Sequence, residues 1–192
     1  MKQTKTSYWS IMSSLVVLII CVACSSKKIV ERIEADTTID LSGRWNDTDS
    51  RQVSEAMIID CLNHSWITNH STNSGGKKPV VIVGAIRNRS MEHVAISAFI
   101  NDIERAFINS GRVSIVASAT ERDEIRAEKE DQRVYSSLKT IKEMGLEYGA
   151  DYMMTGEINS IEDREGRTQI TYYQVDLTLT NIETNEKIWL GQ

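Results

Sequence analysis

Residues 79–86 form the run Pro-Val-Val-Ile-Val-Gly-Ala-Ile, and this run decides the fold class. It has no charged side chain and is rich in β-branched residues, so it predicts a central strand that is buried on both faces. Large apolar side chains then recur at helical spacing, and they are Ile96, Phe99, Ile100, Ile103 and Phe107. Gly111 is expected to end this helix, and a second strand is expected directly afterwards at residues 113–117. The order predicts a right-handed, parallel strand–helix–strand unit.

The C-terminal third of the chain changes to a period of two. Apolar and polar side chains alternate over residues 173–180, which predicts a strand with one buried face. A similar strand is expected at residues 152–161, followed by a charged turn at 162–166. A last short strand is expected at residues 188–190, after a turn at 183–186. These strands would add antiparallel hairpins to the parallel unit.

Three further helices are expected outside the sheet. The first begins with Asp49 as its N-cap. A polar, Gly-containing loop is expected to follow at residues 69–76. Residues 121–133 carry charges of alternating sign and predict a solvated helix with ion pairs such as Arg126–Glu130, although the same surface offers a partner-docking alternative. A short helix is indicated by three apolar side chains, Leu138, Ile141 and Met144.

The composition favours a single globular domain. The chain has 192 residues, of which 41% are hydrophobic and 26% are charged, and these values are typical of a folded domain. Its 22 Lys and Arg residues against 27 Asp and Glu residues give a net charge of −5, which provides no basic field for nucleic acid. The elements together predict an α/β fold. A mixed sheet of about five strands, with a parallel core and C-terminal antiparallel hairpins, would be backed by about four helices.

The N-terminus has the layout of a secretory signal. Lys2 and Lys5 precede an apolar run at residues 15–23. That run is about half of the roughly 20 apolar residues that a membrane-spanning helix needs, which disfavours a permanent transmembrane anchor. A small residue stands directly before Cys24, and the pattern resembles the end of a bacterial lipoprotein signal. The resemblance implies that residues 1–23 are removed and that Cys24 is acylated, and a plain secretory signal is the alternative.

Behind the lipidated cysteine we expect a tether and then one folded domain. Residues 24–40 have mixed charge, no aromatic side chain and no clear period, so they predict a flexible tether. The periplasmic domain is expected to cover residues 41–192. In lipoproteins with a similar signal, a residue other than Asp after the acylated cysteine favours sorting to the outer membrane, and Ser25 fits that pattern.

Cys61 is the cysteine that this processing leaves without a modification or a disulfide partner. It falls on the apolar face of a predicted helix, which favours a buried core position. His64 lies three residues further on and would share the same helix surface, as half of a metal site would require. The sequence offers no second Cys/His pair to complete such a site. We therefore predict no metal site.

Five short segments, taken in order, resemble the LpoB family of penicillin-binding-protein activators over residues 40–191. They are Asp-Leu-Ser-Gly-Arg-Trp-Asn-Asp at 40–47, Val-Val-Ile-Val-Gly at 80–84, Asn-Arg-Ser-Met-Glu-His at 88–93, Gly-Ala-Asp-Tyr at 149–152 and Glu-Thr-Asn-Glu-Lys-Ile-Trp-Leu-Gly at 183–191. The order and spacing of the segments carry the resemblance. More distantly, the fold is similar to the N-terminal domain of TolB and to the periplasmic part of curli-secretion lipoproteins.

The resemblance implies a lipoprotein in the outer membrane that faces the periplasm and binds a bifunctional penicillin-binding protein, a peptidoglycan synthase. It would stimulate glycan polymerisation and peptide cross-linking, with no cofactor and no catalytic step of its own. In some members the tether is long and rich in proline, whereas the single proline here is Pro79. The alternative is a lipoprotein component of a secretion or envelope assembly resembling the curli exporter. A periplasmic hydrolase is disfavoured, because the three histidines stand near no recognisable nucleophile signature.

A partner-binding surface is expected on the sheet face that helices leave open. Its candidate residues are Thr155, Glu157, Asn159, Tyr172, Gln174 and Asp176. An exposed tyrosine beside adaptable polar groups is typical of interface centres, and an ordinary solvated sheet face is the alternative. Tyr173 should point into the core instead. Arg87, Asn88 and Arg89 follow the end of a parallel strand, where α/β sheets often bind ligands, and turn or capping roles are the alternative for them.

Overall fold

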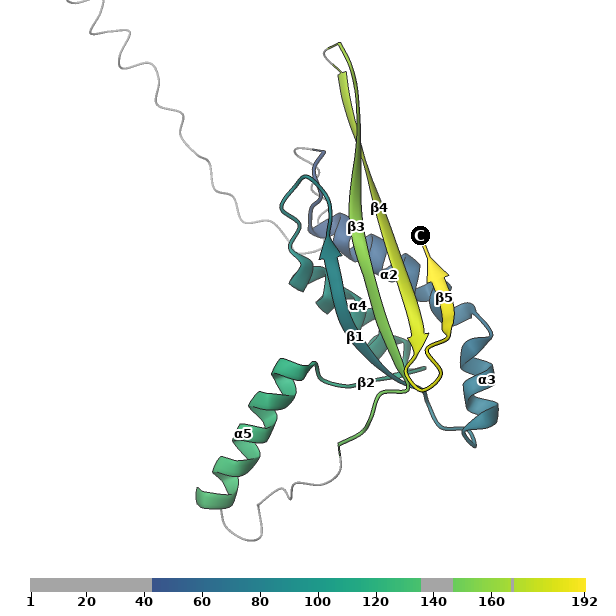
Figure 1. Cartoon of the computed structure of the whole chain (residues 1–192), viewed down its shortest axis with the longest axis vertical. Coiled ribbons are helices and arrows are strands. Elements are labelled where there is room, and N and C mark those ends of the chain that lie inside the picture. The colour runs from purple at the N-terminus through teal and green to yellow at the C-terminus, as the bar shows by residue number, and fades with distance from the viewer. Residues whose placement is uncertain (1–42, 136–146, 167) are drawn as a thin grey trace, which may run out of the picture. The chain divides into compact units, whose positions relative to one another are not determined.

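The computed structural model describes residues 43–135, 147–166 and 168–192. Figure 1 shows four helices and one sheet within these ranges. The elements are α2 (Asp47–Asn63), α3 (Trp66–Asn73), β1 (Val80–Asn88), α4 (Ile96–Ser110), β2 (Ser114–Ile115), α5 (Ala119–Tyr135), β3 (Tyr152–Glu165), β4 (Thr168–Asn181) and β5 (Lys187–Gly191). The expected signal peptide, Cys24, the tether and the helix around Ile141 lie outside the described residues.

The sheet is mixed, as the sequence predicts. Its strand order is β2-β1-β3-β4-β5, with β1 parallel to β2 and β3 and with antiparallel pairing of β3 to β4 and of β4 to β5. The predicted parallel unit is thus confirmed as β1–α4–β2. β2 is shorter than the expected strand at 113–117, because Ser118 and Glu121 already form reciprocal side-chain bonds to each other's backbone N–H at the start of α5.

The β3–β4 hairpin is longer than the sequence predicts. Both strands have 14 residues, and the turn is confined to the neighbourhood of Gly166, whose φ is 60°. The expected charged turn at 162–166 is therefore wrong, since residues 162–165 belong to β3. Both faces of the outer ribbon are exposed there, so charged side chains fit the strand without burial. Figure 1 shows the end of this hairpin reaching beyond the helices.

One face of the sheet forms the core with α2 and α4 (Figure 1). The predicted alternation in β4 is confirmed at Val175, Leu177 and Leu179, which are 6%, 0% and 0% exposed. The largest side chains from the helices that meet this face are Phe99, Phe107, Ile58 and Ile103. Cys61 is also fully buried, as predicted. Tyr173 lies on the core side of β4 but is half-buried, because it stands where the helices end.

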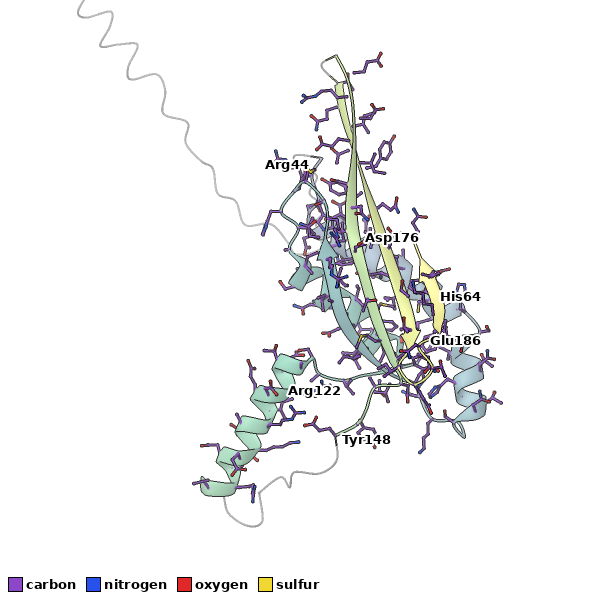
Figure 2. All side chains as sticks on the ribbon, viewed as in Figure 1. Arg44, His64, Arg122, Tyr148, Asp176 and Glu186 are labelled. Carbon is purple, nitrogen blue, oxygen red and sulfur yellow. The ribbon has the colours of Figure 1, made fainter. Side chains whose placement is uncertain are left out.

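Helix α5 is exposed along most of its length, as the charge pattern predicts. The expected Arg126–Glu130 pair is wrong. The Arg126 guanidinium instead binds Asp123 at 2.8 Å and both carboxylate oxygens of Glu147 at 2.8 and 2.9 Å, while Glu130 accepts from Arg133 at 2.9 Å. Glu147 comes from the segment that returns toward β3, near Tyr148 in Figure 2, so a tertiary partner replaces the local one.

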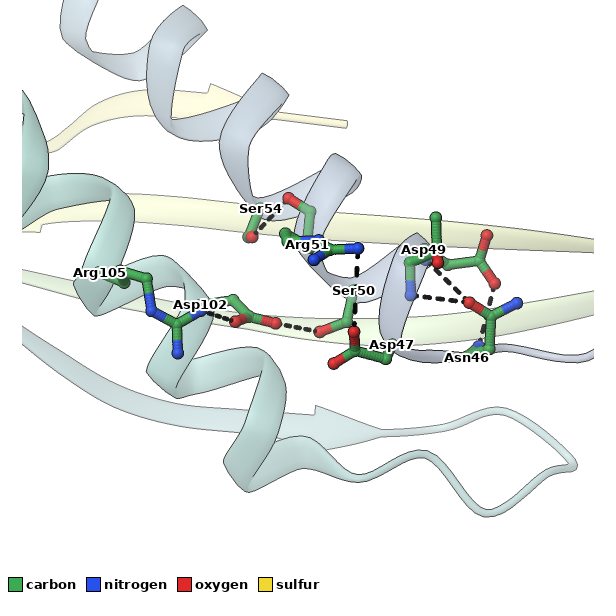
Figure 3. Close-up of polar contacts among 9 residues, drawn as sticks. Asn46, Asp47, Asp49, Ser50, Arg51, Ser54, Asp102 and Arg105 are labelled. Atoms are coloured by element: carbon green, nitrogen blue, oxygen red, sulfur yellow. Dashed lines mark hydrogen bonds and ion pairs between the residues drawn. The ribbon is translucent and has the colours of Figure 1, made fainter. Parts of the chain in front are cut away.

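The N-terminus of α2 carries a reciprocal cap. Asn46 Oδ1 accepts from the backbone N–H groups of Thr48 at 2.8 Å and Asp49 at 3.2 Å, and Asp49 Oδ2 accepts from the Asn46 N–H at 3.0 Å (Figure 3). The expected N-cap, Asp49, is therefore wrong by three residues. Asn46 and Asp49 are both good N-cap residues. Asn46 is the N-cap because Asp49, as the third helical residue, can then complete the reciprocal capping box.

Helix α3 occupies much of the stretch that the sequence predicts as a loop at 69–76. Trp66 is buried, and its Nε1 donates to the Cys61 carbonyl at 2.8 Å. His70 Nδ1 lies 3.0 Å from the hydroxyl of Tyr152, whose ring also packs edge-on against Trp66. These tertiary contacts compensate for weak helix formers such as Asn and Thr. The loop prediction failed because propensity alone does not include them.

Two polar contacts link the helices to each other and to the sheet edge. Ser50 Oγ donates to Asp102 Oδ2 at 2.8 Å, and Arg105 binds the other Asp102 oxygen (Figure 3), so the buried carboxylate between α2 and α4 is satisfied. Trp189 Nε1 on β5 donates to Asp60 Oδ2 at 2.9 Å. The first contact holds α2 against α4, and the second holds α2 against the edge strand β5.

The core is tested by Leu177→Ala, which removes a side chain with no exposure. We expect the free energy of unfolding to fall by about 3 kcal/mol, the typical cost of the lost transfer energy plus a cavity. Urea denaturation followed by far-UV circular dichroism measures the change. Leu190→Ala is the matched control, because Leu190 is 67% exposed on the neighbouring strand and should cost no more than about 0.5 kcal/mol. Equal losses for both variants would contradict the one-sided core.

The cap is tested by Asn46→Ala, which leaves the N–H groups of Thr48 and Asp49 without their side-chain acceptor. We expect a loss of about 1 kcal/mol in the free energy of unfolding. Asn46→Asp keeps the acceptor and should retain most of the stability. If both variants lost the same amount in urea denaturation, the cap assignment would fail.

Candidate functional site: the open face of the sheet

The candidate residues on β3 and β4 form one continuous patch on the face opposite α2 and α4. In the antiparallel register Glu157 lies across from Asp176, and Asn159 lies across from Gln174. Directly opposite residues share a face, and the intervening Ile158 and Val175 are buried on the helix side. The structure therefore brings together six residues, Thr155, Glu157, Asn159, Tyr172, Gln174 and Asp176. Figure 2 labels Asp176 on this ribbon.

The centre of the patch is acidic. Like charges directly across an antiparallel pair are unfavourable, and the opposed Glu157 and Asp176 are such a pair. Each carboxylate takes one hydrogen bond from a neighbouring amide: Asn159 Nδ2 donates to Glu157 at 3.3 Å, and Gln174 Nε2 donates to Asp176 at 2.9 Å. These neutral donors leave the charge of Asp176 uncompensated on the face.

The β1 end of the face supplies basic groups. Arg87 stands beside Glu157 in the parallel β1–β3 register and is exposed. Arg89 Nε lies 3.5 Å from Glu157 Oε2, so this arginine joins the patch through an ion pair. Asn88 does not join it. Its Oδ1 accepts from the backbone N–H of Ser90 at 2.9 Å and its Nδ2 donates to the Glu92 carbonyl at 2.8 Å, which is the turn role weighed as the alternative.

An apolar end of the face was missed by the sequence analysis. Ile161 pairs with Tyr172, and Ile170 is the next residue on the same side of β4. Their exposed fractions are 56% for Ile161, 60% for Tyr172 and 47% for Ile170. The charges at residues 162–165 concealed this stripe, because they suggested a turn. Ile161 is the last residue of the strand expected at 152–161, and continuing that strand through residues 162–165 would have placed Ile170 on the same face.

Tyr173 lies on the opposite face of β4 from the patch and connects this strand to other parts of the domain. Its hydroxyl donates to Glu92 Oε2 at 2.5 Å and accepts from the Trp45 N–H at 3.1 Å, and the rings of Trp45 and Tyr173 pack edge to face. Burial, followed by the hydrogen bond to the Glu92 carboxylate, raises the pKa of Tyr173. The neutral hydroxyl thus ties the start of the domain and the loop after β1 to β4.

The described residues show no constellation for catalysis or metal binding. Burial raises the pKa of the Cys61 thiol to about 12, so it is not a nucleophile at neutral pH. His64 Nδ1 lies 2.8 Å from the Asp60 carbonyl, and His70 contacts Tyr152. Among residues 43–135, 147–166 and 168–192, no three His, Cys, Asp or Glu side chains are grouped as a metal would require.

None of the helices in the described part of the chain combines the length and the apolar character needed to cross a bilayer. The open face is suited to binding. It presents acidic residues at its centre, arginines at its β1 end and exposed apolar side chains at its far end. Such an arrangement suits the recognition of another macromolecule.

Solved structures that match this chain include LpoB from two bacteria. The LpoB C-terminal domain from Salmonella enterica matches with a TM-score of 0.42 and 15% identity, covering 74% of this chain and 95% of that chain. The NMR structure of E. coli LpoB matches with a TM-score of 0.38 and 12% identity, covering 87% and 79%. Lipoprotein GNA1162 from Neisseria meningitidis matches with a TM-score of 0.38 and 9% identity, covering 59% and 78%.

The comparison with curated proteins finds no match. The family model described as the peptidoglycan-synthase activator LpoB matches residues 49–192, which is most of the chain. This match extends from the first turn of α2 to the end of β5 and so includes every described helix and strand except the first two residues of α2. The chain therefore belongs to the LpoB family of peptidoglycan-synthase activators.

Proposed function

We propose that this protein is an outer-membrane lipoprotein that binds a bifunctional penicillin-binding protein and stimulates its synthesis of peptidoglycan. The observation that carries the proposal is the family match over residues 49–192. That family consists of regulatory activators, so the chain would act by contact and leave the bond-making to the synthase. The match favours this function over a secretion or envelope assembly resembling the curli exporter.

We propose further that the open face of the sheet is the surface that meets the synthase. The opposed carboxylates of Glu157 and Asp176 are the first argument, because a like-charged pair costs stability unless positive charge compensates it, and within the pair Arg89 compensates only Glu157. A Lys or Arg side chain of the synthase, placed between them, would do so. Arg87 at the corner of the same face would pair with an acidic group of the synthase.

The apolar stripe supplies the second argument. A row of exposed apolar side chains on one face of a ribbon marks an interaction surface more often than a solvated one. Tyr172 lies between the acidic centre and Ile161–Ile170, so it is placed to be the aromatic anchor of the contact. The two strands beneath it are held by the long β3–β4 ladder, which limits the entropy lost on binding.

The lipid anchor completes the proposal. Residues 1–23 would be removed, Cys24 would be acylated, and residues 24–40 would connect the lipid to the domain. The 17 steps from Cys24 to Leu41 span at most about 60 Å at the length of an extended residue. The short tether sets an upper limit on the height at which the open face meets the synthase above the membrane.

The docking surface is tested with Tyr172→Ala in the full chain, solubilised in detergent. We expect its affinity for the purified bifunctional penicillin-binding protein of the same cell to fall about tenfold, as for an aromatic anchor. Stimulation of glycan polymerisation on lipid II should fall in parallel. The matched control is Tyr148→Ala, since Tyr148 is 82% exposed but stands before β3 and away from the patch.

A charge reversal tests the acidic centre in the same binding assay. Asp176→Lys should weaken binding about tenfold and make the remaining affinity less sensitive to salt. Glu55→Lys on the exposed side of α2 makes the same change in net charge on the opposite face and should bind like the unmodified chain. Equal loss in both charge variants, or no loss in Tyr172→Ala, would show that the synthase docks elsewhere.

The anchor is tested by Cys24→Ser, which removes the thiol that the lipid would modify. We expect the unmodified chain to incorporate labelled palmitate and to sediment with the outer membrane, and the variant to do neither. Cys61→Ser is the control, because Cys61 is buried and should not affect labelling. Mass spectrometry of the mature chain that showed a first residue without acyl groups would overturn this part of the proposal.

A further inference from the structure

Strand β2 covers only the beginning of the outer edge of β1. Val80 pairs with Ser114 and Val81 pairs with Ile115, and the Val116 N–H still donates to the Val81 carbonyl at 3.1 Å. After this point the chain leaves the sheet for α5. Within the described part of the chain, no strand pairs with the outer side of β1 from residue 82 onward.

The backbone direction shows what this edge offers. In a strand, residues two apart direct their N–H and C=O groups to the same side. The carbonyl of Val81 points to β2, so both backbone groups of Val83 point to the same outer side, away from β3. The register irregularity between Val83 and Ile86 keeps the regular part of this edge short. A strand edge without a partner strand is a template for another strand, and Val83 as a whole residue is 6% exposed.

A groove runs beside this edge. Its volume is about 530 Å³, and its walls come from β1, α4 and the first turn of α5. The lining includes Ile82, Val83, Gly84, Ile100, Glu104 and Glu121. The groove thus has a strand edge with a donor and an acceptor on one side and apolar side chains around it. These are the elements that recognise an extended peptide by strand addition.

The groove also has a definite charge. Glu104 on α4 and Glu121 on α5 both line it, and the pKa of Glu104 is raised by burial and then by the nearby charge of Glu121. Arg122 lines the groove as well, with its Nε 4.0 Å from Glu147, a carboxylate that already binds Arg126. Two carboxylates against one guanidinium still give the groove a net negative charge. The two facing carboxylates therefore favour a basic group on whatever enters.

We propose that an extended segment of a partner protein adds to the outer edge of β1 at Val83 and places a Lys or Arg side chain between Glu104 and Glu121. A second copy of this chain is a poor occupant, because pairing β1 with its own edge would bring two such carboxylate pairs together. This inference is independent of the open face and of the synthase, since it concerns a different surface of the domain.

The test uses the full chain in detergent and a synthetic strand, acetyl-Thr-Val-Thr-Lys-Thr-Val-Thr-amide, as the probe. We expect the peptide to bind and to slow hydrogen exchange of the Val83 amide. A peptide with Glu in place of Lys should bind about tenfold more weakly, because of the two carboxylates. A peptide with N-methylated central residues should not slow exchange at Val83, since it cannot form the ladder.

A double variant, Glu104→Gln with Glu121→Gln, is expected to remove most of the preference for Lys over Glu while the fold is unchanged. Glu55→Gln with Glu124→Gln is the matched control, because both residues are exposed and neither lines the groove. The proposal is overturned if the probe does not bind or if binding ignores the peptide's charge. It is also overturned if the Val83 amide is already protected in the free chain, either by the chain itself or, in a concentration-dependent way, by a second copy.

Discussion

The structure depends on the covering of the sheet by helices on one face only. Helices α2 and α4 pack against the side of β3 and β4 that carries Leu177 and Leu179, and the other side is left to solvent. Successive side chains of a strand point to opposite faces. Each of these strands therefore alternates between apolar residues that face the core and polar residues that face solvent. The positions of the six candidate residues on β3 and β4 follow from that requirement, since each stands one residue away from a side chain on the core side of its strand.

This constraint is also why much of the fold can be predicted. The apolar run at 79–86 and the alternation at 173–180 each indicate a strand from the local sequence pattern. Gly111 ends α4 in the left-handed conformation that glycine favours. The local sequence pattern does not decide between two residues that are equally suited to the same role. Asn46 and Asp49 are both good N-caps, and only the reciprocal hydrogen bonds seen in the structure identify Asn46 as the N-cap. Helix α3 depends on the burial of Trp66, a tertiary contact that local propensity does not contain.

The candidate site was predictable in its centre and not at its ends. Glu157 and Asp176 follow from the alternation alone, but their opposition across the ladder follows from the register, which the turn near Gly166 sets. The long pairing also depends on Gly156, because a Cβ there would lie 2.3 Å from the Asp176 carbonyl oxygen. A turn placed four residues too early left out residues 162–165 of β3 and the pairing of Asp163 with Ile170, which puts Ile170 on the face.

The exposed edges of this sheet call for protection against pairing between copies, and charge provides it in two places. An unpaired strand edge and an apolar ribbon both promote aggregation. The carboxylates of Glu104 and Glu121 stand beside the outer edge of β1, and the outer ribbon carries Asp163 directly across from Ile170. Identical copies would oppose like charges at both positions, whereas a partner with basic groups would not. Acidic side chains that oppose pairing between copies would at the same time favour a partner of complementary charge.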